Sequence, residues 1–149
     1  MPVEILRRRA AKGYSARRLK KVAAAVLDIV GATEAELSLA FIGDREMRRL
    51  NARYRGRDYA TDVLSFPADE NLPPGTRLLG DVVISVDKAA SQAREKGRGL
   101  DQELVTLVIH GIVHLLGYDH ERSAKEAKRM KRLENKIYRR LCDRGLIQV

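Results

Sequence analysis

The sequence is poor in cysteine, proline and aromatic residues, and it has no long apolar run. Of 149 residues, one is cysteine, four are proline, five are tyrosine and two are phenylalanine, and tryptophan is absent. The lone Cys142 excludes an internal disulfide and indicates a reducing compartment. No stretch approaches the roughly 20 apolar residues that span a bilayer, and the N-terminus lacks the apolar segment of a secretory signal. We therefore expect a soluble, cytoplasmic protein that makes no membrane contact.

The length and the order of the apolar segments predict a single α/β domain, which we place at residues 1–149. Short apolar runs alternate with segments of helical periodicity, and glycines stand where helices are expected to end. Strands are expected at 3–8, 36–42, 61–67 and 78–85, and helices at 15–31, 43–56, 86–97, 100–117 and from 123 onward. This order predicts an α/β (α+β) fold: a small mixed β-sheet flanked by helices, with a zincin-like helix carrying histidines. The Pro/Gly-rich segment 68–77 is a candidate hairpin connection.

Positive charge is concentrated near the N-terminus. The formal net charge is +9 at pH 7, and eight Lys or Arg lie between Ile5 and Leu27 with no acidic residue among them. A basic surface attracts polyanions through counterion release, so RNA or DNA is a reasonable partner. A solvated face that only keeps the protein soluble explains the same charges equally well. Within this stretch, Arg17 and Arg18 are the candidates for RNA contact.

All three histidines of the chain lie within residues 110–120, HGIVHLLGYDH. His110 and His114 are four residues apart on an expected helix, so both side chains project from one face. Gly117 can end that helix in a left-handed turn, which allows His120 to reach the same point. Three neutral imidazoles with an open fourth position are typical of a catalytic zinc site. We predict that these histidines bind one metal ion per chain, zinc being expected, although nickel, copper and iron accept the same ligands.

Gly111 argues against peptide hydrolysis. The spacing of the three histidines and Gly117 is that of metzincin proteases, in which a glutamate general base directly follows the first histidine. Here glycine occupies that position. Glu103 shares the histidine face but lies about 10 Å upstream along the axis, too far for direct proton transfer. Asp119 is either a partner of the neighbouring His120 or a solvated turn residue, and we prefer the latter interpretation.

The chemistry of such a site suits phosphodiester cleavage. Zinc lowers the pKa of water and polarises a substrate oxygen, and cations are then needed to hold the phosphate. Arg55 and Arg57 are candidates, because a guanidinium binds phosphate through two parallel hydrogen bonds. The alternative is that each is a solvated residue near a helix end. Our hypothesis for Gly111 is that a small residue leaves room for a bulky substrate beside the metal.

Three segments together resemble the bacterial YbeY family of metal-dependent endoribonucleases. HGIVHLLGYDH is similar to the histidine signature of that family, LNARYRGRDYATDVLSFP (50–67) resembles its second signature, and LLGDVVIS (78–85) its third. Their order and spacing agree with the family, and the resemblance covers essentially the whole domain. At other signature positions in 50–67 we expect strand-end hydrogen bonding that shapes the cleft; these residues are Thr61, Asp62 and Ser65.

The resemblance implies an activity, partners and roles for particular residues. The activity is that of a single-strand-specific endoribonuclease of small-subunit rRNA 3′-end maturation and ribosome quality control. The implied partners are rRNA, the small ribosomal subunit, ribosomal proteins and assembly GTPases. Catalytic roles are implied for Arg55 and His110. The implied zinc ligands are His110, His114 and His120.

Two other interpretations of the sequence remain open. One is a ribosome-assembly factor that binds RNA and uses the metal to hold its fold or a partner surface, without nuclease activity. The other is a different metallohydrolase, including a protease with an unorthodox base. The first stays open because the sequence offers no obvious general base.

Overall fold

Four strands form one mixed sheet in the order β1-β2-β4-β3. The first three strands of that order are parallel, and β3 runs antiparallel to β4. The strands are β1 Val3–Arg7, β2 Glu36–Ile42, β3 Val63–Pro67 and β4 Leu78–Ser85. The computed structural model describes residues 3–68 and 77–147. Antiparallel pairing of β3 with β4 agrees with the expected hairpin, although most of its connection lies outside the described residues.

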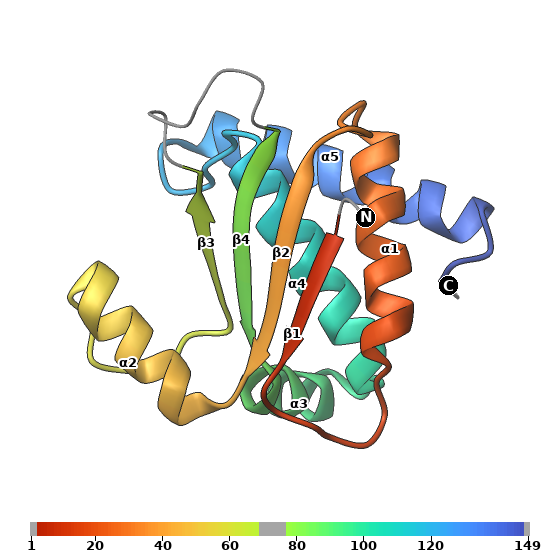
Figure 1. The fold of residues 1–149 in the computed structure, drawn as a ribbon. Coiled ribbons are helices and arrows are strands. Elements are labelled where there is room, and N and C mark those ends of the chain that lie inside the picture. Colours follow the sequence, from red (N-terminus) through yellow and green to blue (C-terminus); the bar gives the residue numbers. More distant parts are fainter. Residues whose placement is uncertain (1–2, 69–76, 148–149) are drawn as a thin grey trace.

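Helices cover the two faces of the sheet unequally, as Figure 1 shows. The helices are α1 Ala16–Ile29, α2 Asp44–Arg55, α3 Val86–Lys96, α4 Leu100–Leu115 and α5 Ala124–Asp143. Two of them, α1 and α4, pack on one face, and α5 packs on the outer side of both. Helix α2 stands beyond β3, and α3 lies at one end of the sheet. The predicted α/β class is therefore confirmed, with a sheet, a central helical layer and α5 outside it.

The two faces of β4 belong to two separate apolar clusters. Val82 and Ile84 join the main core beneath α1 and α4, whereas Val83 joins a smaller cluster. This alternation follows from the two-residue period of a strand. The smaller cluster includes Met47 of α2, which covers its part of the second face. The main core accordingly lies between the sheet and α4.

Local signals in the sequence set the helix ends. A serine hydroxyl accepts a hydrogen bond from the first turn of α1, α3 and α5, which satisfies a backbone N–H that lacks a partner within the helix. The serines are Ser15, Ser85 and Ser123. Gly97 ends α3 in the left-handed conformation, with φ +67°. Within residues 3–68 and 77–147, no helix is long and apolar enough to cross a membrane.

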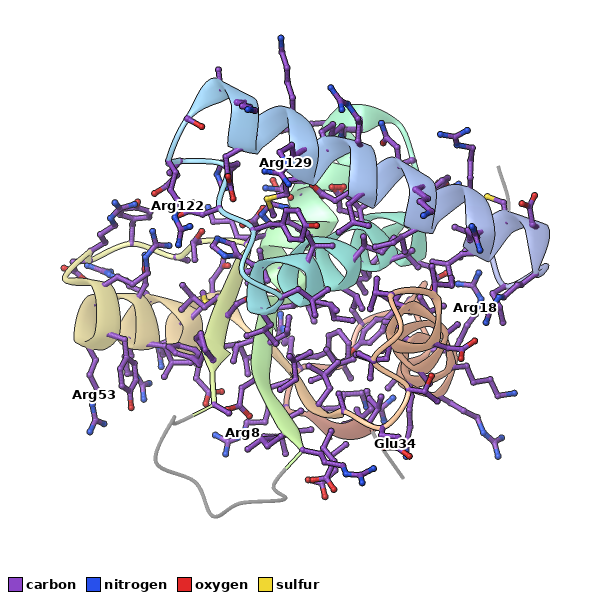
Figure 2. The ribbon with its side chains drawn as sticks, turned by 90° about the horizontal axis from the view of Figure 1, so that it is seen from above. Arg8, Arg18, Glu34, Arg53, Arg122 and Arg129 are labelled. Carbon is purple, nitrogen blue, oxygen red and sulfur yellow. The ribbon has the colours of Figure 1, made fainter. Side chains whose placement is uncertain are left out.

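Part of the basic N-terminal stretch is neutralised by acids from other elements. Arg8 forms an ion pair with Glu46 on α2 at 2.7 Å. Arg9 forms another with Asp87 on α3 at 3.1 Å. Figure 2 shows labelled arginines spread over several sides of the molecule, with Arg53 pointing outward from α2. Ion pairs therefore neutralise Arg8 and Arg9, whereas Arg17, Lys20 and Lys21 border one groove beside β1.

Candidate metal centre and its pocket

Helix α4 and the turn after it bring the three histidines together. His110 and His114 project from the same face of α4, and their ring centroids lie 6.0 Å apart. The chain then turns at Gly117, whose φ of +103° is accessible to glycine at little cost. His120 follows, and its ring centroid lies 5.5 Å from that of His110 and 6.1 Å from that of His114. The three rings form a nearly equilateral triangle.

The rings lie slightly farther apart than three imidazoles around one metal ion would. Zn–N distances of about 2.1 Å and tetrahedral angles place imidazole centroids about 5 Å apart. The observed separations of 5.5 to 6.1 Å exceed that by about 0.5 to 1 Å. Nitrogen donors alone suit zinc and also nickel, copper and iron. The ligand atoms that converge within 4.8 Å are those of His114, Asp119 and His120, so His110 as a further ligand stays a prediction.

A carboxylate on α5 orients the first histidine. Glu134 Oε2 lies 3.2 Å from Nδ1 of His110, and the Glu134 side chain is 15% exposed. A hydrogen bond from Nδ1 to this carboxylate would leave Nε2 of His110 facing a metal. Sequence reasoning missed this residue. Its signal was a lone acid within the apolar stripe of α5, four residues after Met130 and three before Ile137.

Asp119 lies at the same centre. One ligand atom each from His114, Asp119 and His120 lie within 4.8 Å of one another. The backbone N–H of Glu121 donates to Asp119 Oδ1 at 2.9 Å. That bond, with nearby cationic groups, holds the pKa of the Asp119 carboxyl below its usual range. Asp119 is thus a turn residue, as expected, and also an ionised oxygen donor beside two histidines.

The histidines open into a pocket of about 460 Å³, and part of its wall carries arginines. That part of the wall comes from the end of α2, the loop 57–62 and the start of β3. Arg55 and Arg57 line it, so the structure brings both sequence candidates to the histidines. Both side chains are exposed, and no carboxylate among the described residues pairs with either. Tyr59, which sequence reasoning did not select, lines the same pocket.

Gly111 faces the sheet, and the hypothesis that it makes room for a substrate is wrong. A Cβ atom at Gly111 would lie 2.5 Å from Cγ1 of Val82, which is fully buried on β4. The Gly111 carbonyl also accepts a hydrogen bond from Ser65 Oγ at 3.1 Å. The space beside this glycine is therefore filled by protein. A glutamate of the metzincin kind has no room there.

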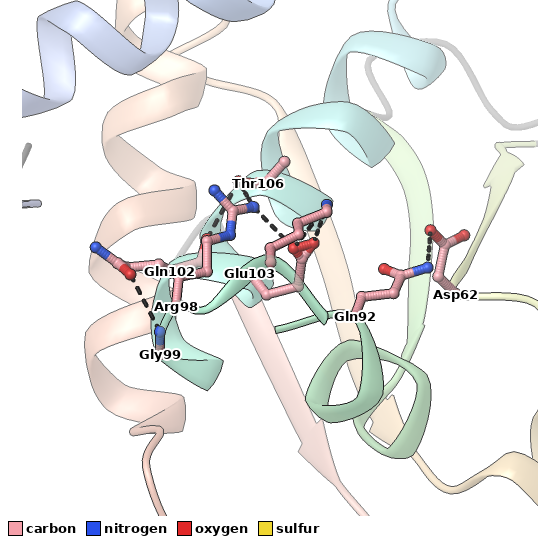
Figure 3. A network of polar contacts seen from close by, with 8 residues as sticks. Asp62, Gln92, Arg98, Gly99, Gln102, Glu103 and Thr106 are labelled. Atoms are coloured by element: carbon pink, nitrogen blue, oxygen red, sulfur yellow. Dashed lines mark hydrogen bonds and ion pairs between the residues drawn. The ribbon is translucent and has the colours of Figure 1, made fainter. Parts of the chain in front are cut away.

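Glu103 is fully buried and bound by two cations; Figure 3 shows its contact with Arg98. Lys96 donates to it at 2.7 Å and Arg98 at 2.7 Å, and Arg98 also donates to Thr106. Burial alone raises the pKa of the Glu103 carboxyl, but the hydrogen bonds from the two cations outweigh it and hold the pKa below its usual range. Glu103 does not line the histidine pocket. It joins α3 to α4 and takes no direct part in the site.

The signature residues before and within β3 form hydrogen bonds that shape the pocket wall. Asp62 accepts from the backbone N–H of Val63 and from Gln92 on α3; the second bond is drawn in Figure 3. Thr61 donates to the same carboxylate. Ser65 holds the Gly111 carbonyl, as described above. The expected strand-end hydrogen bonding is confirmed.

The two N-terminal arginine candidates lie away from the histidine pocket. Arg18 forms an ion pair with Asp101 on α4, and it donates to the carbonyl of Leu146 at 2.7 Å. Arg17 borders a different groove, beside Val3 and Ile5 of β1. RNA contact by Arg17 and Arg18 stays a prediction, and it would lie outside the histidine pocket.

These observations define an α/β protein with a candidate three-histidine metal centre beside an arginine-bearing wall. Its sequence matches the family profile described as "Endoribonuclease YbeY" over residues 5–142. The chain belongs to the YbeY family, as the resemblance of its three segments predicted.

Individual relatives support this assignment at several levels. The chain is 48% identical to the "Endoribonuclease YbeY" of Aquifex aeolicus, over 83% of this chain and 82% of that protein. It is 41% identical to that of Geobacter sulfurreducens, over 99% and 100%. Identity to that of Anaeromyxobacter sp. is 53%, and the match covers 84% of this chain but 64% of the longer relative. The fold is similar to the solution structure of TM1509 from Thermotoga maritima, with a TM-score of 0.61, 26% identity, and 97% and 94% coverage.

Proposed function

We propose that the protein is a metal-dependent endoribonuclease that cleaves single-stranded RNA, with the 3′ end of small-subunit rRNA as its substrate. The observation that carries the proposal is the convergence of His110, His114 and His120 in a pocket whose wall also bears Arg55 and Arg57. The family assignment supports it, because the matching relatives carry the name of an endoribonuclease. A cytoplasmic location, in the compartment of the ribosome, follows from that substrate.

Each part of the pocket has a role in this proposal. The three histidines hold the metal ion, which we propose is zinc, one per chain. When bound, such an ion polarises a phosphate oxygen and lowers the pKa of water. Glu134 fixes the ring of His110 through Nδ1. Arg55 and Arg57 hold the phosphates that flank the cleavage site and stabilise charge developing on phosphate oxygens.

Peptide hydrolysis of the metzincin type is disfavoured by the same structure. Its general base would replace Gly111, and Val82 already occupies the space that even a β-carbon would need. Asp62 and Glu103 are held by other donors and cations. Neither Asp62 nor Glu103 lies at the position that the general-base glutamate takes in a metzincin.

The test is cleavage of a single-stranded rRNA fragment by the metal-loaded protein beside an identically purified His114→Ala variant. We expect the wild type to cut and the variant to lose cleavage while keeping its circular dichroism spectrum. The variant also controls for contaminating ribonucleases. Equal cutting by both proteins, or cutting by neither, would reject the nuclease assignment and favour the assembly factor that binds RNA without cleaving it.

A further inference from the structure

Tyr59 is a tyrosine whose ring is left open to solvent beside the candidate metal centre. Tyr59 is 51% exposed, and it lines the pocket of the three histidines. The chain has few aromatic residues, and all of them lie in the described ranges. Among these, the other rings pack on one another or against the main core, although Tyr54 is itself 57% exposed; they are Tyr14, Phe41, Tyr54, Phe66, Tyr118 and Tyr138. Tyr59 belongs to neither apolar cluster.

The backbone beneath this ring is fixed. The buried side chain of Asn51 on α2 donates through Nδ2 to the carbonyl of Tyr59 at 2.8 Å, and Asn51 is 0% exposed. The Tyr59 N–H donates to the carbonyl of Arg57 at 3.0 Å. An exposed aromatic side chain on an anchored backbone loses little conformational freedom when it binds a flat partner. The anchored backbone therefore holds Tyr59 at the pocket, although the side chain itself is not buried.

The neighbours of the ring indicate the kind of partner. Nη1 of Arg57 lies 3.4 Å from the Tyr59 hydroxyl, and Arg55 lines the same pocket. Two guanidiniums without a carboxylate partner among the described residues suit a ligand with repeated phosphates. A flat exposed ring beside them suits a ligand that also has flat π-faces. Single-stranded nucleic acid has both features, whereas a duplex keeps its bases stacked inside.

We propose that Tyr59 is a stacking platform for one unpaired nucleobase of the RNA whose phosphates lie on Arg55 and Arg57. The proposal rests on the proposed function and adds a reason for its preference for single strands. Because every base has a π-face, the contact favours unpaired nucleotides and tolerates any sequence. A duplex cannot offer a base to the ring without losing a base pair.

The test measures binding of a labelled single-stranded oligoribonucleotide of about ten nucleotides. It is performed with the full chain carrying His114→Ala, so that the RNA stays intact. Replacing Tyr59 by Ala is expected to weaken binding about tenfold or more, the usual loss for one stacked base. Phe or Trp at position 59 should bind within about twofold of the parent protein, because each keeps the stacking face. These substitutions leave the backbone bonds of Tyr59 in place, so all variants are expected to fold.

Two controls separate stacking from other roles of the residue. Tyr59→Ala should leave the salt dependence of binding unchanged, whereas Arg57→Ala should reduce its slope by about 0.7 for one lost phosphate contact on a single strand. A strand of the same length with abasic sugars should bind the parent protein and Tyr59→Ala equally. If Tyr59→Phe binds as weakly as Tyr59→Ala, the residue acts through its hydroxyl on Arg57, and stacking is rejected.

The outcomes distinguish failure of the stacking proposal from failure of the proposed nuclease function. If Tyr59→Ala in the otherwise wild-type chain cuts RNA with unchanged KM and binds it with unchanged affinity, stacking is wrong and the nuclease assignment stands. The proposed function is rejected if His114→Ala leaves cleavage intact or if the parent protein has no affinity for single strands. Either result also rejects the stacking role of Tyr59. A raised KM with kcat retained is the expected result, because stacking of a remote base contributes equally to ground-state and transition-state binding.

Discussion

Gly111 of α4 meets Val82 of β4 at a distance that leaves no room for a β-carbon, which would lie 2.5 Å from Val82 Cγ1. Val82 is fully buried and β-branched, so its side chain has little freedom to move aside. The glycine therefore lets the histidine-bearing helix approach the sheet closely. The same contact leaves no room for the glutamate that serves as general base at this position in a metzincin. Packing of α4 on the sheet therefore also excludes peptide hydrolysis of the metzincin type.

Gly111→Ala is expected to lower the free energy of unfolding by about 1–2 kcal/mol. Overpacking a core costs about 1–3 kcal/mol, and the higher helix propensity of alanine offsets up to about 1 kcal/mol of it. The measurement is chemical denaturation, with Val82→Ala and the double variant completing a double-mutant cycle. The two substitutions should couple favourably, because removing the Val82 methyls makes room for the new β-carbon. Simple additivity would show that the two residues do not constrain each other.

Glu134→Ala is expected to weaken metal binding about 10- to 100-fold, the usual effect of removing the partner of a histidine ligand. Without the carboxylate, the ring of His110 loses the contact that fixes its orientation and its proton on Nδ1. The measurement is competitive titration of zinc against a chromophoric chelator, which does not depend on activity. The control is Glu126→Ala, because Glu126 is a partly buried acid on the same helix that does not line the histidine pocket. Equal affinity of the two variants would show that Glu134 does not support the metal site.

The elements of the fold could be predicted because their signals are local. The segment ELSLAFI became β2 Glu36–Ile42, and α3 ended at Gly97 as expected. Ser123 begins the last helix because its hydroxyl satisfies a free N–H wherever a helix starts. The meeting of the three histidines was also accessible, since helical spacing and one turn glycine determine it.

Contacts between distant segments were not accessible in the same way. Glu134 reaches His110 only because α5 packs across α4, and nothing in the local pattern specifies that crossing. Tyr59 becomes part of the pocket only because α2 ends beside the histidines. The hypothesis that Gly111 leaves room for a substrate was wrong, although local spacing argued against it. Gly111 follows the buried Val108 and Leu104 by three and seven residues, which places it on the face toward the core.

Glu103 is expected to make stability fall with pH in the acid range. Its folded-state pKa is depressed, so its contribution is complete above its ordinary pKa of 4.5 and is lost as pH falls below that value toward the folded-state pKa. Glu103→Gln should be less stable than the wild type by about 2 kcal/mol at neutral pH, since charged hydrogen bonds to Lys96 and Arg98 are lost. The difference should shrink below pH 4.5. Denaturation midpoints of both proteins from pH 3 to 7 would test this, and a constant difference would contradict it.

Arg55→Ala is expected to reduce kcat/KM for single-stranded RNA about 100-fold, the usual loss when one group that stabilises developing charge is removed. Arg55 lines the histidine pocket, whereas Arg49 on the same helix borders a separate hollow of about 740 Å³. Arg49→Ala is therefore the matched control, because it removes the same charge without touching the pocket. Arg55→Lys should fall between the wild type and Arg55→Ala, because an ammonium keeps the charge but not the two parallel hydrogen bonds of a guanidinium. Equal activity of Arg55→Ala and Arg49→Ala, at equal metal content, would show that Arg55 contributes only general positive charge and that phosphate is held elsewhere in the pocket.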